Sequence, residues 1–131
     1  MRVTADTNVL VRAITGDDPK QARIAQTELA QAEAVAIAIP ALCELVWVLD
    51  QGYKISLPQI SQIIRDLLDS ANVIVNRPAA EAGLSLLDAG GDFADGVIAF
   101  DGRRLGADMF VSFDKQAVKL LEAQGERARQ L

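Results

Sequence analysis

Short apolar runs alternate with helix-forming stretches along the whole chain. The clearest run is residues 34–39, with the sequence Ala-Val-Ala-Ile-Ala-Ile, and Pro40 follows it. A continuous apolar run, without polar residues at alternate positions, is typical of a strand buried on both faces of a parallel sheet. Further strands are predicted at residues 1–5, 73–75 and 108–113, and a helical stretch follows each of them.

This alternation of strands and helices predicts an α/β fold. Right-handed connections between parallel strands place helices on both faces of the sheet. We therefore expect a three-layer α/β/α sandwich with a mainly parallel sheet of four to five strands. The length suits a single domain, residues 1–131, and half of the residues are apolar, which is enough for a core. The polar tail after Gly125 indicates that a last edge strand is short or absent.

Acidic residues stand where the predicted strands pass into helices. Asp6 follows the first strand and Asp114 follows the last. Glu44 is expected in the first turn of the helix after the second strand, and Asp92 and Asp95 open a later helix. Because the carboxyl ends of parallel strands meet at one edge of a sheet, where ligands bind, we expect these carboxylates to converge. Three of them also suit helix N-caps, and this simpler explanation stays open for Asp6, Asp92 and Asp114.

Glu44 is the acid that helix capping explains least. Its neighbours in residues 41–47 are apolar, so we expect little water around its carboxylate. An isolated buried carboxylate carries a desolvation cost, which a bound cation removes. The same apolar pattern leads us to predict that Cys43 and Trp47 belong to the core.

The chain has no histidine and only one cysteine, Cys43. These counts exclude Ser-His-Asp triads, Cys–His nucleophile pairs, histidine-ligated zinc and histidine acid–base ribonuclease chemistry. A site made of carboxylates alone suits Mg²⁺ or Mn²⁺, because both ions prefer oxygen ligands. Such ions activate water for attack on a phosphodiester, so that no protein nucleophile is needed.

The net charge of -5 argues against simple electrostatic capture of nucleic acid. If the acids gather around metal, however, basic residues can form a local track for phosphate. The candidates, which also fit ordinary solvated charges, are Arg12, Lys54, Arg103, Arg104 and Lys115. No apolar stretch approaches the roughly 20 residues of a membrane span. The N-terminus lacks a secretory pattern, so we expect a cytoplasmic protein without a membrane partner.

Four segments of the sequence together resemble the PIN-domain family, and within it the toxin of the bacterial VapBC toxin–antitoxin type. The resemblance covers essentially the whole chain. In order, the segments are residues 5–12 (ADTNVLVR), 39–49 (IPALCELVWVL), 92–99 (DFADGVIA) and 111–115 (VSFDK). Each segment alone is weakly specific, whereas all four in this order and at compatible spacings are a strong signal.

The resemblance implies a toxin endoribonuclease that depends on Mg²⁺, with Mn²⁺ as a substitute. It implies an acidic site of Asp6, Glu44, Asp95 and Asp114, with Asp92 as an auxiliary acid. The polar positions that it assigns to support of the site are Thr7, Asn8 and Ser112. It also implies a homodimer and a cognate VapB-type antitoxin that blocks the site, commonly with a basic side chain. An acidic pocket receives an arginine well, through bidentate hydrogen bonds.

Two features of the sequence depart from the family pattern. Gly96 stands where alanine is more usual, which we interpret as a small change that costs helix propensity. The pair Asp101-Gly102 is expected to interrupt a helix that is commonly alanine-rich.

Three other functions compete with a nuclease. A phosphoacceptor signalling domain needs a lysine at the end of a late strand, whereas here Lys115 comes directly after an acid. A haloacid-dehalogenase-like phosphatase needs an aspartate where Asn8 stands. A PIN fold that only binds a partner is disfavoured because all four acids are present.

Overall fold

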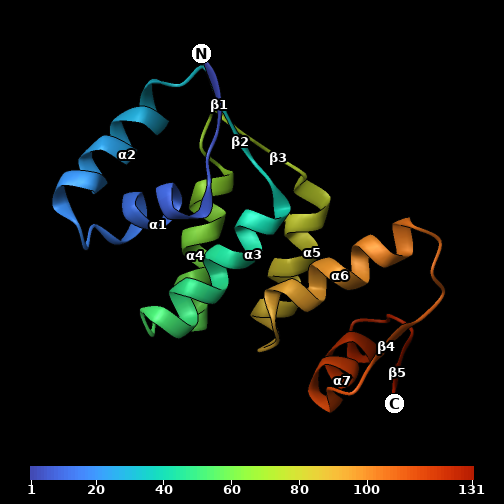
Figure 1. The fold of residues 1–131 in the computed structure, drawn as a ribbon. Coiled ribbons are helices and arrows are strands. Elements are labelled where there is room, and N and C mark those ends of the chain that lie inside the picture. The colour runs from blue at the N-terminus through green and yellow to red at the C-terminus, as the bar shows by residue number, and fades with distance from the viewer. The chain divides into compact units, whose positions relative to one another are not determined.

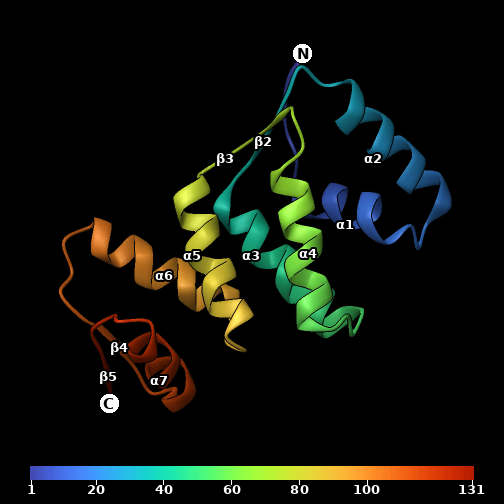
Figure 2. The same cartoon turned by 180° about the vertical axis from the view of Figure 1, so that it is seen from behind.

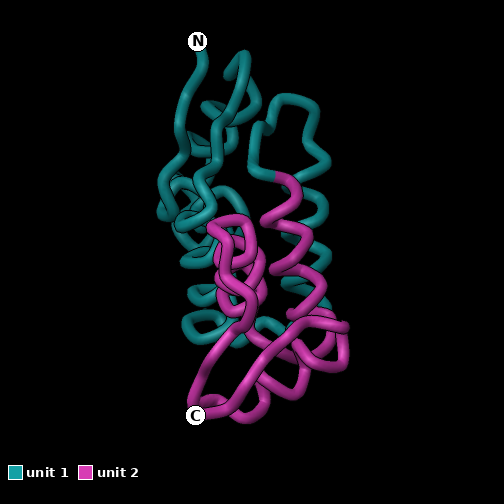
Figure 3. Tube along the Cα trace, turned by 90° about the vertical axis from the view of Figure 1, so that its right-hand side faces the viewer, with its two compact units in different colours: residues 1–76 teal, residues 77–131 magenta.

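The computed structural model describes all residues, 1–131, and forms two compact units (Figure 3). Unit 1 comprises Met1–Asn76 and unit 2 comprises Arg77–Leu131. Each unit has its own small sheet, and the strands in both sheets are parallel. No helix in the structure has the length and apolar character that crossing a membrane requires.

Unit 1 is built from three strands and five helical segments. β2 is the central strand, and Val35 pairs with Val3 on one side and with Val73 on the other. α1 and α2 form a helical hairpin, α1 also packs on α3, and α4 packs on β3 (Figures 1 and 2). The elements in chain order are β1 (Arg2–Thr4), α1 (Thr7–Thr15), α2 (Pro19–Gln31), β2 (Ala34–Ile37), α3 (Ile39–Trp47), the π-helical segment η1 (Val48–Gly52), α4 (Leu57–Leu68) and β3 (Val73–Val75).

Local sequence determines where the helices of unit 1 begin and end. The side chains of Asp6, Asp18 and Ser56 each accept a hydrogen bond from the backbone N–H three residues further along the chain. Each bond satisfies a donor that has no partner inside the helix. Pro19 occupies the first position of α2, where its missing N–H costs nothing. Gly16 ends α1 in the left-handed conformation, with φ of 66°.

Unit 2 is built from three helices and two strands. α5 packs closely against α6, and β4 pairs with β5. The elements in chain order are α5 (Arg77–Asp88), α6 (Phe93–Arg104), β4 (Phe110–Ser112), α7 (Lys115–Ala123) and β5 (Ala128–Gln130). A small core joins the three helices through the buried side chains of Leu86, Ala99 and Leu121.

The expected α/β class and the parallel strands are confirmed, and the five strands are divided between a sheet of three and a sheet of two. β2 is buried except at Ala36, so the prediction of burial on both faces holds only in part. The short last strand is confirmed, because β5 has three residues. The expected interruption at Asp101-Gly102 is wrong, because α6 continues through both residues to Arg104.

Candidate functional site

Asp6 lies just beyond the carboxyl end of β1, where the chain enters α1. Its backbone is extended, and its carboxylate accepts a hydrogen bond of 3.0 Å from the N–H of Val9. Asp6 is exposed, while Thr7 is half-buried and Asn8 is exposed in the first turn of α1. The helix terminus therefore orients a carboxylate that remains open to solvent. Capping and cation binding are compatible at this position.

A groove of about 470 Å³ opens beside Asp6, between α1 and α2. Val9 and Ile24 contribute apolar walls, and the Ile24 side chain is exposed. Asp6 and Glu28 contribute acidic groups to the same groove. Its lining therefore suits a ligand that is partly apolar and partly basic.

Glu44 lies on the exposed face of α3, so the expectation of little water around it is wrong. It also stands in the second turn of α3 rather than in the first, because the helix begins at Ile39. The physical reason for its exposure is the spacing of the inward-facing residues, which follows the i, i+3, i+4, i+7 pattern of a helix face. These buried residues are Leu42, Leu45, Val46 and Leu49.

Trp47 was expected in the core and is instead 64% exposed. It lies three residues after Glu44, so the two side chains share the outward face of α3. Cys43 is half-buried, so its expected core position holds only in part. Trp47 does not fall on the i, i+3, i+4, i+7 pattern of the buried residues, and this spacing is the sequence signal that places it outside the core.

Asp92 and Asp114 are both helix N-caps in unit 2. Asp92 accepts hydrogen bonds from the N–H groups of Ala94 (2.6 Å) and Asp95 (3.3 Å) at the start of α6. Asp114 accepts two such bonds at the start of α7, of 2.9 and 3.1 Å. The hydroxyl oxygen of Ser112 in turn accepts a 2.9 Å hydrogen bond from the N–H of Asp114. Ser112 therefore fixes the backbone that carries this acid.

Asp95 is half-buried near the start of α6, and its carboxyl has a raised pKa. Burial raises the pKa of its carboxyl, and the negative charges of Asp92 and Asp114 raise it further. These three acids of unit 2 therefore repel one another when ionised. A divalent cation would relieve the repulsion, and a donor set of carboxylate oxygens fits Mg²⁺ or Mn²⁺. Neither unit gathers three acidic side chains into a complete metal-binding cluster of its own.

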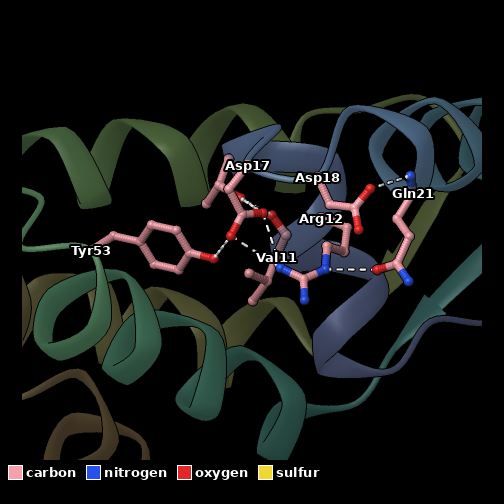
Figure 4. A network of polar contacts seen from close by, with 7 residues as sticks. Val11, Arg12, Asp17, Asp18, Gln21 and Tyr53 are labelled. Carbon is pink, nitrogen blue, oxygen red and sulfur yellow. Dashed lines mark hydrogen bonds and ion pairs between the residues drawn. The ribbon is translucent and has the colours of Figure 1, made fainter.

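Arg12, a candidate for phosphate contact, is the centre of a polar network in unit 1 (Figure 4). Its guanidinium donates to both carboxylate oxygens of Asp17, at 2.9 and 3.1 Å, and to the side-chain oxygen of Gln21 at 2.8 Å. Asp17 also accepts hydrogen bonds from the hydroxyl groups of Tyr53 and Thr15. The network ties α1 to α2 and to the end of η1, a role that sequence reasoning missed.

The other basic candidates differ in their surroundings. Arg103 forms an ion pair of 3.1 Å with Glu126, and the guanidinium groups of Arg103 and Arg104 lie within 6 Å of the Phe100 ring centre, at 5.8 and 5.9 Å. Lys115 is exposed at the first position of α7. Among these candidates Lys115 is the one that directly follows a proposed site acid.

Gly96 has a packing role that the sequence interpretation missed. A Cβ atom at this position would lie 2.5 Å from the carbonyl oxygen of Ala82 and 3.0 Å from the Cα of Gly83. Glycine therefore permits the close approach of α6 to α5, one residue after Asp95. The interpretation of Gly96 as a small change in helix propensity is wrong, because packing determines this position.

Two comparisons with known proteins extend these observations. The family model described as the PIN domain matches residues 3–122, which include parts of both units. The matched range contains every acid of the candidate site. No curated protein matches the chain.

Proposed function

This chain belongs to the PIN-domain family, and from that premise we propose that it is a toxin endoribonuclease. PIN domains are in general metal-dependent nucleases that act on nucleic acid. In our proposal Asp6, Glu44, Asp95 and Asp114 form the catalytic acidic site, with Asp92 as an auxiliary acid. The cofactor is Mg²⁺, for which Mn²⁺ substitutes, and the substrate is RNA in the cytoplasm.

One structural repetition supports this proposal best. Asp6 stands two residues after β1, and Asp114 stands two residues after β4. Both strands are paired in parallel, and both acids cap the next helix through backbone N–H bonds. A carboxylate that is held in this way keeps a fixed direction, and the carboxyl ends of parallel strands are where ligands bind in open α/β sheets.

The proposed role of each acid in binding metal or substrate follows from its surroundings. Asp6 and Asp114 supply oriented oxygens, because the helix termini hold them. Asp95 favours binding of a cation, because burial and its acidic neighbours disfavour the carboxylate without a counter-ion. Glu44 is exposed on a rigid helix and can meet the substrate directly. When bound, Mg²⁺ or Mn²⁺ would supply the acidity that turns water into a nucleophile near neutral pH.

Thr7, Asn8 and Ser112 complete the proposed site as supports. Ser112 holds the backbone of Asp114 through its hydroxyl group, and Thr7 and Asn8 lie in the turn that begins at Asp6. Lys115 is proposed to contact the substrate phosphate, because it is exposed beside Asp114. Arg12 is the weaker candidate, because Asp17 already neutralises it.

We also propose that a VapB-type antitoxin inhibits the enzyme and that the chain acts as a homodimer. The groove beside Asp6 supports the first of these proposals, because Val9 and Ile24 suit an apolar segment while Asp6 and Glu28 suit an arginine. Light scattering of the purified chain tests the homodimer, which a monomeric mass would contradict.

A metal-dependence assay tests the proposed activity. We expect the purified chain, free of antitoxin, to cleave single-stranded RNA in Mg²⁺ or Mn²⁺, to stop in chelator and to resume when the ion is restored. Sequencing of the cleaved ends then identifies the preferred RNA. Cleavage that persists unchanged in chelator would contradict the proposal.

A further inference from the structure

The exposed indole ring of Trp47 has no role in the site described so far. We propose that Trp47 is a substrate-binding residue on which one base of the RNA stacks, next to the phosphodiester that is cleaved. This inference rests on the proposed function and extends it from the acids to the bases of the substrate. Trp47 and Glu44 both lie in unit 1.

The position of Trp47 places its ring beside a proposed catalytic acid. Trp47 and Glu44 are three residues apart on α3, and both are exposed. Residues at this spacing have Cβ atoms about 5–6 Å apart on the helix surface. A phosphate held at Glu44 would therefore bring the base of a neighbouring nucleotide within reach of the indole.

The surroundings of Trp47 favour a single base over a protein partner. The exposed residues one turn before and one turn after it are Glu44 and Gln51, which are both polar. Contiguous apolar patches mark protein interfaces, and an aromatic ring between polar side chains does not form one. A single exposed ring in such a setting can stack one base, as each aromatic ring does in proteins that bind single strands.

The charge of the molecule gives a second reason for stacking. The net charge is -5, and Arg12 and Arg103 are already paired with Asp17 and Glu126. Attraction to phosphate is therefore a weak source of affinity for this chain. Stacking of a base on an aromatic ring contributes affinity that does not depend on the charge of the protein.

Trp47 is the only tryptophan, so its fluorescence reports on this position alone. The experiment titrates the Asp95→Asn variant in Mg²⁺ with a fluorescently labelled single-stranded oligoadenylate RNA. A matched probe has the same number of phosphates but lacks the bases. We expect the RNA to quench Trp47 emission and the abasic probe to leave it unchanged. Anisotropy of the labels determines when each probe is bound.

Two fluorescence results would overturn the proposal. One is unchanged Trp47 emission when anisotropy shows that the RNA is bound. The other is an emission maximum that shifts to the blue with protein concentration alone, because a second copy of the chain would then cover the ring.

Steady-state cleavage by the wild-type chain and its variants gives an independent readout. Loss of a stacked base predicts that Trp47→Leu raises KM by roughly 5- to 150-fold, with kcat within about twofold of the wild-type value. Trp47→Phe should restore most of the affinity, since it restores an aromatic ring. Ile74→Ala, at another exposed apolar side chain of unit 1, is the control and should leave KM unchanged.

The two proposals fail in distinguishable ways. Wild-type cleavage with an unchanged KM in Trp47→Leu overturns the role of Trp47 and leaves the nuclease intact. A wild-type chain that cleaves no RNA overturns the nuclease, and the fluorescence titration still decides whether Trp47 binds a base.

Discussion

Asp95 combines partial burial with two acidic neighbours, and both factors raise the pKa of its carboxyl above the ordinary value of 3.8. Between 3.8 and the raised value, the folded chain keeps a proton that the unfolded chain loses. By linkage, this group makes the metal-free protein less stable as pH rises through that interval. A bound cation would reverse the preference, because it would favour the ionised carboxylate.

Asp95→Asn removes this titration. In chelator we expect the variant to have a higher Tm than the wild type at pH 7. The gain in unfolding free energy should be small, on the order of 0.5 kcal/mol. The difference should shrink as pH falls toward 3.8. Thermal unfolding from pH 4 to 8 measures it, and a variant that is less stable at pH 7 would contradict the argument.

Asp17 shows the opposite shift, because its charged form is favoured. The hydrogen bond from the Tyr53 hydroxyl lowers the pKa of Asp17 most. Desolvation is the next largest effect and opposes it, while the bonds from Thr15 and Arg12 lower the pKa further. The ionised carboxylate therefore stabilises the fold above pH 3.8. This contribution is lost as pH falls from 3.8 through the lower pKa of the folded state.

Asp17→Asn should therefore lower the Tm at pH 7. The gap to the wild type should narrow as pH falls from 3.8 through the lower folded pKa, where the wild-type carboxylate also loses its charge. Tyr53→Phe removes one of the hydrogen bonds and should act in the same direction with a smaller effect. Thermal unfolding from pH 3 to 7 checks both variants, and a gap that does not vary with pH would show that the charge of Asp17 is not involved.

At the scale of the elements, α5 and α6 approach each other most closely where glycines face the neighbouring helix. A Cβ at Gly96 would contact backbone atoms of Ala82 and Gly83, while a Cβ at Gly83 would lie 2.7 Å from the Phe93 ring. Gly102, on the same helix α6, has no atom within 4 Å of its position for a Cβ. Gly96 and Gly102 are therefore both helical, but only Gly96 is packed against a neighbouring helix.

This difference predicts opposite effects of one substitution. Gly96→Ala should lower the free energy of unfolding by about 1–3 kcal/mol, because the added methyl group overpacks the helix contact. Gly102→Ala should raise it by about 0.5–1 kcal/mol, because alanine favours a helix and meets no neighbour. Denaturation in urea measures both values. Stabilisation by Gly96→Ala equal to that by Gly102→Ala would contradict the packing.

The same elements show what sequence could predict. Caps at Asp6, Asp92 and Asp114 are predictable because an N-cap depends on residues within one turn. The exposure of Glu44 and Trp47 was missed, because the apolar composition of α3 hid which of its faces packs inward. The need for Gly96 depends on α5, whose position no local pattern encodes.

At the scale of the whole molecule, acidic residues follow parallel strands in both units, while Arg12 and Arg103 form ion pairs within the protein. The chain has no histidine, so a metal site built from its acids would suit hard cations. The proposed function requires that these carboxylates are needed for RNA cleavage.

The most direct test compares the cleavage of one RNA by the wild type, Asp6→Asn, Asp95→Asn and the control Asp101→Asn, at saturating Mg²⁺. Asp101 lies on the same helix as Asp95 and is exposed, so its loss should change the rate by less than about twofold. We predict that Asp6→Asn and Asp95→Asn each lower the rate by at least about 100-fold, because each removes a charged ligand. Folded Asp6→Asn and Asp95→Asn variants that cleave as fast as Asp101→Asn would contradict the account.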